Sequence, residues 1–117
     1  MCIFRKRKTT DADIKENRRQ IELMAGSFEM LKVLTTNEEV LNRINVLQEK
    51  VRYMNPTTNE TALSLDKKIE NVIGETKTSL LKIKSDEDYD KILKDFRYLE
   101  MLIEDRINHS RSGDNRK

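Results

Sequence analysis

Apolar residues in this chain recur at alternating steps of three and four positions, in four successive stretches. This spacing places them on one side of an α-helix, whereas a strand would show alternation at every second residue. Each stretch therefore predicts an amphipathic helix with a stripe of heptad type. The stripes are Ile14, Ile21, Met24, Phe28 and Leu31, with Asn17 completing the heptad; Val40, Ile44, Leu47, Val51 and Met54; Ala62, Leu65, Ile69, Val72, Thr76, Leu80 and Ile83; and Tyr89, Ile92, Phe96, Leu99 and Ile103, with Ile107 one turn further.

The pattern loses phase between stretches, which indicates separate helices. Continuing the third stripe would place apolar residues at positions 87 and 90, where Glu87 and Asp90 stand. Each restart also carries a capping-box pattern, a Ser or Thr followed three residues later by an acid. The pairs are Thr10 and Asp13, Thr36 and Glu39, Thr57 and Glu60, and Ser85 and Asp88, and Pro56 ends the second helix. The predicted helices span about 11–34, 37–54, 58–84 and 86–108.

Short connections between successive helices favour an antiparallel arrangement. We therefore predict an all-α fold, an antiparallel (up-down-up-down) four-helix bundle with short loops over residues 10–109. A basic, apolar-tipped tail (1–9) precedes it, and a disordered basic tail (110–117) follows it. A charged fraction of 38%, only 5% aromatic residues, three Gly and one Pro suit helices with polar outer faces. We expect Ile44, Leu47, Ile69, Leu80, Phe96 and Leu99 to be buried, and Lys50, Lys67 and Lys91 to be exposed.

Charge is segregated along the chain. Residues 9–105 carry 15 basic and 20 acidic side chains, while residues 1–8 carry four basic and no acidic ones, and residues 106–117 carry four basic and one acidic. A nucleic-acid-binding domain usually has its basic residues on the folded surface, where they meet phosphates. The predicted bundle would instead repel an anionic partner, so such a partner should meet the tails.

The N-terminal tip combines apolar and basic residues. Cys2, Ile3 and Phe4 stand directly before a basic run. This pattern suits the surface of an anionic membrane, and acylation of Cys2 would strengthen the attachment. A nucleic-acid arm and a tail without a role remain open. The cations of the run are Arg5, Lys6, Arg7 and Lys8.

The sequence offers no catalytic or metal-binding pattern. One Cys and one His are too few for a disulfide framework or a Cys/His zinc site, and no Gly-rich phosphate loop occurs. The acidic run 86–90 begins like a calcium loop, but Lys91 and Arg97 occupy the positions that need a Gly and an acid. We therefore expect no enzyme activity and no cofactor.

Without an apolar run of about 20 residues or a signal peptide, we expect a soluble cytoplasmic protein, with the tip as its contact to the membrane.

Several apolar residues lie beside or off the four stripes, more than one bundle core requires. Surplus apolar surface usually has a partner, so we predict a homodimer or a helix-binding groove that involves Met30, Val33, Leu34, Leu41 and Val46. The predicted function is that of a non-catalytic helical interaction module, a small adaptor or regulator that acts through protein contacts. Two alternatives stay open: a nucleic-acid-associated regulator that uses its basic tails, and a small-ligand sensor with an interhelical pocket. The other surplus residues are Ala25, Leu63, Ile73, Leu81, Leu93, Leu102 and the three Tyr.

Two glycines fall inside predicted helices. Gly26 and Gly74 each weaken a helix relative to Ala. Three explanations stay open for each glycine: it occupies a surface position that tolerates it, it allows the helix to kink, or it allows another helix to approach closely.

Overall fold

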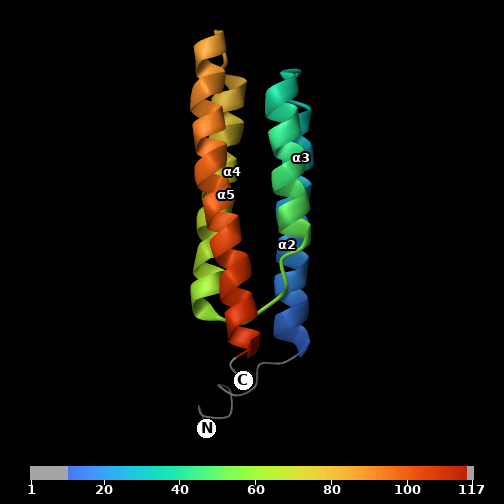
Figure 1. Ribbon diagram of the computed structural model, residues 1–117. Coiled ribbons are helices and arrows are strands. Elements are labelled where there is room, and N and C mark those ends of the chain that lie inside the picture. The colour runs from blue at the N-terminus through green and yellow to red at the C-terminus, as the bar shows by residue number, and fades with distance from the viewer. Residues whose placement is uncertain (1–10, 116–117) are drawn as a thin grey trace.

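The computed structural model describes the backbone of residues 11–115 and the side chains of residues 12–109. This part of the chain consists of four α-helices and contains no strand (Figure 1). The helices are α2 (Asp11–Lys32), α3 (Glu38–Arg52), α4 (Glu60–Leu81) and α5 (Asp86–Asn115). The prediction of an all-α fold is confirmed for this part of the chain.

The helices pack as a ring of neighbours around one core. α2 contacts α3, α3 contacts α5, α5 contacts α4, and α4 contacts α2; the α4–α5 contact is the most extensive and the α2–α4 contact the least. The result is a slender body of 57 × 22 × 19 Å. In Figure 1 the α2–α3 and α4–α5 connections lie at one end of the helices, and the α3–α4 connection crosses the other end.

The core consists mainly of residues from the predicted stripes, with Ala25, Ile73 and Leu102 added from beside them. All six residues expected to be buried are buried, and Phe28, Ile69 and Ile92 are fully enclosed. Lys67 and Lys91 are exposed as expected. The expectation for Lys50 is wrong, because its ammonium group reaches α5 and lies half-buried in ion pairs with Glu104 and Glu100. The hydrogen bond to Glu104 raises the pKa of Lys50.

Two predicted capping residues are wrong by one or two positions. The side chain of Asn37, not Thr36, caps α3 by accepting from the Val40 N–H at 2.9 Å. Asn59, not Thr57, caps α4 by accepting from the Ala62 N–H at 2.9 Å. Asn is at least as good an N-cap as Thr. The Thr57 hydroxyl instead accepts from the Asn59 N–H at 3.0 Å, which supports the cap from outside the helix.

The start of α5 follows the predicted pattern more closely. The Asp88 carboxylate accepts from the backbone N–H groups of Lys84 at 2.7 Å and Ser85 at 3.2 Å. These two bonds lower the pKa of Asp88. The other predicted start, at Thr10, lies outside the described residues.

The end of α5 requires a correction. The helix continues to Asn115, seven residues beyond its predicted end, so the backbone of residues 110–115, expected to be tail, is helical. Residues 110–115 contain no Pro, and the one Gly among them costs a helix only about 1 kcal/mol.

Candidate functional site

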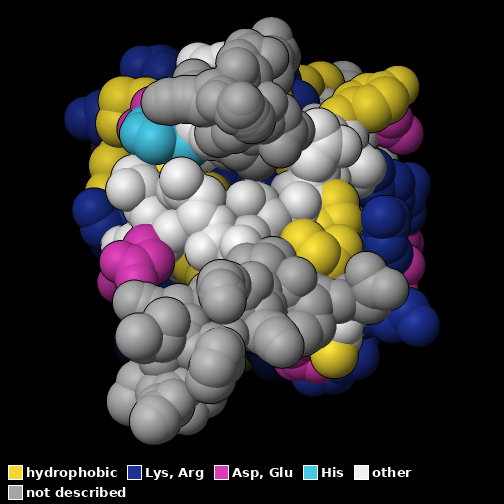
Figure 2. Space-filling view, turned by 90° about the horizontal axis from the view of Figure 1, so that it is seen from below, with side chains coloured by type: hydrophobic (Ala, Val, Ile, Leu, Met, Phe, Trp, Pro, Cys, Tyr) yellow, Lys and Arg dark blue, Asp and Glu magenta, His cyan; other side chains and the backbone are white. Residues whose placement is uncertain are grey.

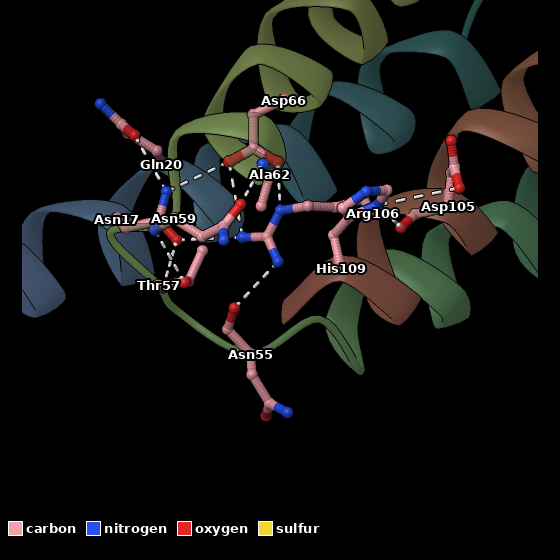
Figure 3. Close-up of polar contacts among 10 residues, drawn as sticks. All are labelled: Asn17, Gln20, Asn55, Thr57, Asn59, Ala62, Asp66, Asp105, Arg106 and His109. Atoms are coloured by element: carbon pink, nitrogen blue, oxygen red, sulfur yellow. Dashed lines mark hydrogen bonds and ion pairs between the residues drawn. The ribbon is translucent and has the colours of Figure 1, made fainter. Parts of the chain in front are cut away.

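A buried polar cluster lies near the end of the bundle that the α3–α4 connection crosses (Figure 3). At its centre, the fully buried guanidinium group of Arg106 on α5 donates from Nε to Asp66 Oδ1 on α4 at 2.7 Å. Its other nitrogens donate to the Asn55 carbonyl oxygen at 3.0 Å and to Asn17 Oδ1 on α2 at 3.0 Å. One side chain thus joins α2, α4, α5 and the α3–α4 connection.

Asn17 completes the cluster from α2. Its Nδ2 donates to Asp66 Oδ2 at 3.1 Å, and its Oδ1 accepts from the Thr57 N–H at 3.0 Å as well as from Arg106. An isolated buried charge would be very unfavourable, whereas a paired and hydrogen-bonded one is tolerated. Both carboxylate oxygens of Asp66 accept hydrogen bonds from other members of the cluster. The cluster thereby fixes how the helices and the connection fit together.

The position of Arg106 corrects the sequence analysis, which counted this residue with the basic C-terminal segment. Arg106 is three positions after Ile103 and extends the apolar stripe of α5, so its side chain points into the bundle. Figure 2 looks at this end of the molecule: in the part that the grey atoms leave visible, uncharged side chains and backbone occupy the middle, and Lys and Arg side chains lie around the sides.

The five predicted interface residues do not form one patch. Met30 and Val33 on α2 are exposed, by 51% and 76%, and Leu34 is half-buried against the core. On α3, Leu41 is half-buried and Val46 is 44% exposed. Leu41 lies two turns from Gln48, which donates to the Ala25 carbonyl oxygen on α2, whereas Val46 lies one turn from Lys50, which faces α5. Leu41 and Val46 therefore occupy opposite edges of α3.

Other surplus apolar residues divide between core and surface. Ala25, Ile73 and Leu102 are buried and belong to the core, so they leave no surface to cover. Leu81, Tyr53 and Tyr98 are exposed. Leu23 and Met101 are exposed too, although the sequence analysis did not single them out.

An apolar groove runs between α2 and α4, where the helix contact is least extensive. Its volume is about 450 Å³, and the buried side chains of Leu31 and Ile73 lie at its floor. We call this feature the α2–α4 groove. Its walls include Leu23, Gly26 and Met30 from α2 and Glu70, Gly74 and Lys77 from α4.

Both glycines that line the α2–α4 groove face open space. A Cβ atom added to Gly26 or Gly74 would meet nothing within 4 Å. α2 and α4 continue through them without a break. Packing within the described chain therefore does not require either glycine.

The surroundings of the Glu70 carboxylate in the groove favour its protonated form. Its partial burial, together with the negative charge of Asp66, raises the pKa of Glu70, and Lys67 opposes this effect in part. Among the described residues, neither Glu70 nor Lys77 has an ion-pair partner within 4 Å.

A second cleft, the α2–α3 cleft, lies on the other side of α2. It encloses about 440 Å³ between α2, the end of α3 and the α3–α4 connection. Arg18, Glu22 and Arg52 contribute charged groups, and Ile21, Met54 and Pro56 contribute apolar ones.

The described residues contain neither a candidate metal-binding cluster nor a membrane-spanning helix. No group of three or more His, Cys, Asp or Glu side chains there could hold a metal ion. No helix in the same part is long and apolar enough to cross a membrane. The predicted membrane-contact residues Cys2, Ile3, Phe4, Arg5, Lys6, Arg7 and Lys8 lie outside it.

The sequence contains signals for two of the three residues of these sites that were not predicted. Arg106 continues the spacing of Phe96, Leu99 and Ile103, so a charged residue on a core stripe marked a buried pair. Leu23 precedes Met30 by seven residues and therefore lies on the same side of α2. Asp66 gave less signal, because it stands beside the stripe residue Leu65 and not on it.

No protein-family model matches the chain, no curated protein matches it in sequence, and no solved structure matches it.

Proposed function

We propose that this chain is a non-catalytic helical interaction module, an antiparallel up-down-up-down bundle that binds another protein through the α2–α4 groove. The observation that carries this proposal is the exposure of Leu23 by 58% and Met30 by 51% on the wall of a groove with an apolar floor. Exposed apolar side chains that gather at a concave surface are typical of protein-binding sites.

The antiparallel topology is supported by the short connections and by the course of the chain in Figure 1. Connections of only a few residues join neighbouring helix ends, and successive connections lie at opposite ends of the bundle. In this topology α2 and α4 run in the same direction. The groove then presents two parallel helices to a partner.

A photo-crosslinking amino acid in place of Leu23 tests the proposal in cells that make the protein. We expect one discrete protein adduct from this position, and its loss when Met30→Glu is added. The matched control places the same group at Asn71, which is exposed on α4 and does not line the groove. Absence of an adduct at position 23, or an equal adduct at position 71, would refute the assignment of the groove.

Membrane contact through the N-terminal tip remains part of the proposal as a second attachment. Its support is the sequence, in which Ile3 and Phe4 precede four cations while residues 9–105 carry five more acidic than basic groups. Deleting residues 1–8 should abolish binding to anionic liposomes, and replacing Ile3 and Phe4 by Ser should leave binding that salt removes. Tighter binding to duplex DNA under the same conditions would favour the nucleic-acid alternative.

The α2–α3 cleft favours a second candidate function, that of a small-ligand sensor. Two guanidinium groups, Arg18 and Arg52, lie beside the apolar side chains of Ile21 and Met54, an arrangement that suits a small amphiphilic anion. Octanoate is a simple probe. Octanoate should change the NMR chemical shift of the Met54 methyl group, Arg52→Gln should abolish this change, and the control Arg97→Gln should leave it as in the wild type. Absence of any change at millimolar octanoate would exclude this class of ligand.

A further inference from the structure

The walls of the α2–α4 groove show a symmetric spacing. Leu23 and Met30 are seven residues apart on α2, which places them two turns apart on the same side of the helix. Glu70 and Lys77 have the same separation on α4. Gly26 lies near the midpoint of the first pair, and Gly74 near the midpoint of the second.

The two midpoints lie at nearly the same level of the bundle. The hydrogen bond between Asn17 and Asp66 sets the register of α2 against α4, and both helices advance by 1.5 Å per residue. The midpoint of Leu23 and Met30 lies about 9.5 residues beyond Asn17, and the midpoint of Glu70 and Lys77 lies about 7.5 residues beyond Asp66, so their levels differ by about 3 Å. The apolar pair and the charged pair therefore have nearly the same centre.

We propose that the α2–α4 groove is covered by a second copy of this chain, packed antiparallel about a two-fold axis that crosses the groove at the level of Gly26 and Gly74. This inference rests on the proposed function and names its partner.

A two-fold interface must be complementary to itself, so that residue i meets residue j and residue j meets residue i. With the axis across the helices, each wall of the groove faces the same wall of the second copy, running in the opposite direction. Leu23 then lies opposite Met30 of the second copy. Glu70 lies opposite Lys77 of the second copy, and this pair occurs twice.

The charge pattern favours the antiparallel over the parallel arrangement. In a parallel dimer α4 of each copy would face α2 of the other, so Glu70 and Lys77 would lie opposite the apolar wall of Leu23 and Met30 and gain no partner of opposite charge. In the antiparallel dimer Glu70 and Lys77 each gain a partner of opposite charge. Within one copy, neither has an ion-pair partner among the described residues. Lys67 stays beside Glu70 on its own helix, and the exposed Glu22 lies at the rim in contact with water.

The glycines fit the same geometry. A Gly in a helix interior is unfavourable relative to Ala, and neither Gly26 nor Gly74 is required by a neighbouring atom of its own chain. At the centre of a two-fold interface, each glycine lies closest to the same glycine of the second copy. The absence of side chains there allows the two backbones to approach.

Charge exchange tests this arrangement directly. Dissociation constants of the full chain are measured by sedimentation equilibrium for the wild type, Glu70→Lys, Lys77→Glu and the double variant. Each single variant places like charges opposite each other twice per dimer, so we expect its dissociation constant to rise by roughly tenfold or more. The double variant restores both pairs with their signs exchanged, and its dissociation constant should return to within about threefold of the wild type.

Two controls separate this effect from a change in net charge or in folding. Lys68→Glu and Glu75→Lys alter the same kinds of charge on α4 outside the groove, where both residues are exposed, and should leave dimerisation unchanged. Far-UV circular dichroism verifies that each variant is helical. The weakening by the single variants should also diminish as salt is raised.

Three results would overturn the inference: a wild type that is monomeric at every concentration, a dimer that the single variants leave intact, or a double variant as weak as the single ones. The photo-crosslinking experiment distinguishes these failures from failure of the proposed function. An adduct of twice the chain mass at position 23 agrees with a second copy. An adduct of another mass keeps the interaction module and rejects the dimer.

Discussion

The polar cluster around Arg106 and the α2–α4 groove are opposite exceptions to the usual distribution of residues. In the cluster, charged and amide groups lie inside the bundle: Arg106, Asp66 and Asn17 are at most 4% exposed. In the groove, apolar side chains lie on the outside: Leu23 and Met30 are more than half exposed. Each feature has an energetic cost that some other group must offset.

The two features differ in where that other group comes from. The cluster is completed within the chain, because Asp66, Asn17 and the Asn55 carbonyl all accept from Arg106. The groove has no such completion in the described chain. A buried polar group with partners indicates a structural role, whereas an apolar groove without a cover indicates a binding surface. This difference is why the proposed function rests on the groove.

The largest effect is expected from breaking the cluster. Arg106→Met keeps the length of the side chain and removes its charge, which leaves the Asp66 carboxylate buried without its main partner. We expect the free energy of unfolding to fall by about 3–5 kcal/mol, a large part of the 5–15 kcal/mol typical of a small domain. Urea denaturation followed by circular dichroism measures this change.

A triple variant provides the control for this loss. Replacing Asn17 and Asp66 by Leu together with Arg106→Met removes the three buried charged and amide side chains of the cluster. Such replacements of buried ion pairs are often neutral or stabilising, so we expect most of the lost stability to return. The Asn55 carbonyl and the Thr57 N–H lose partners and limit the recovery. A triple variant as unstable as Arg106→Met would contradict the view that the unpaired carboxylate causes the loss.

The cluster also shows how far the sequence could predict this structure. Helical periodicity predicted the four helices and the core, because burial of an amphipathic face depends on local spacing, which the sequence contains. The capping errors at Thr36 and Thr57 arose because Asn37 and Asn59, both stronger N-caps, stand close behind. The partnership of Asn17, Asp66 and Arg106 joins residues 40 to 89 positions apart, and no local pattern encodes such a pairing.

Of the residues predicted to form a helix-binding groove, Met30 lines the groove between α2 and α4. Binding of a partner there stays a prediction. Whether α2 places such a residue beside α3 or beside α4 depends on the order of helices around the core, which spacing along one helix does not specify. Leu41 and Val46 were grouped with Met30 for this reason.

Thr76 is a buried polar residue of the core that, unlike the cluster, lacks a hydrogen-bond partner for its hydroxyl group among the described residues. Its side chain is fully buried, and its hydroxyl oxygen contrasts with the hydrogen-bonded polar atoms of the cluster. Thr76→Val keeps the shape and removes this atom. We expect the free energy of unfolding to rise by about 1–2 kcal/mol, as measured by urea denaturation. Thr78→Val, at an exposed position of the same helix, is the control; an equal gain there would attribute the effect to helix propensity.

Substitution of the two glycines of the groove should have opposite effects on the stability of the chain and on its dimerisation. Ala fits at Gly26 and Gly74 without contact, so each Gly→Ala change should stabilise the isolated chain by up to about 1 kcal/mol. The same methyl groups lie at the centre of the proposed dimer and should weaken it. Thermal unfolding at low concentration and sedimentation equilibrium measure the two effects. A variant that is more stable and dimerises as tightly as the wild type would show that nothing packs closely on the glycines.

The smallest effect concerns pH and compares Glu70 in the groove with Asp88 at the start of α5. Partial burial raises the pKa of Glu70, so the native state holds its proton more tightly than the unfolded chain does. Stability from this group therefore falls as the pH rises from the unfolded pKa through the folded pKa. Two backbone N–H groups lower the pKa of Asp88, so its contribution is present above the unfolded pKa and is lost as the pH falls through the folded pKa.

Two neutral variants should therefore respond to pH with opposite signs. Relative to the wild type, Glu70→Gln should gain stability as the pH rises from about 4 to 7, because it removes a carboxylate that burial disfavours. Asp88→Asn should lose stability over the same range, because it removes a carboxylate that hydrogen bonds favour. Urea denaturation at a series of pH values, at protein concentrations low enough to keep the groove open, measures both. A common sign for the two variants would show that net charge, and not the local environment of each carboxylate, controls the response.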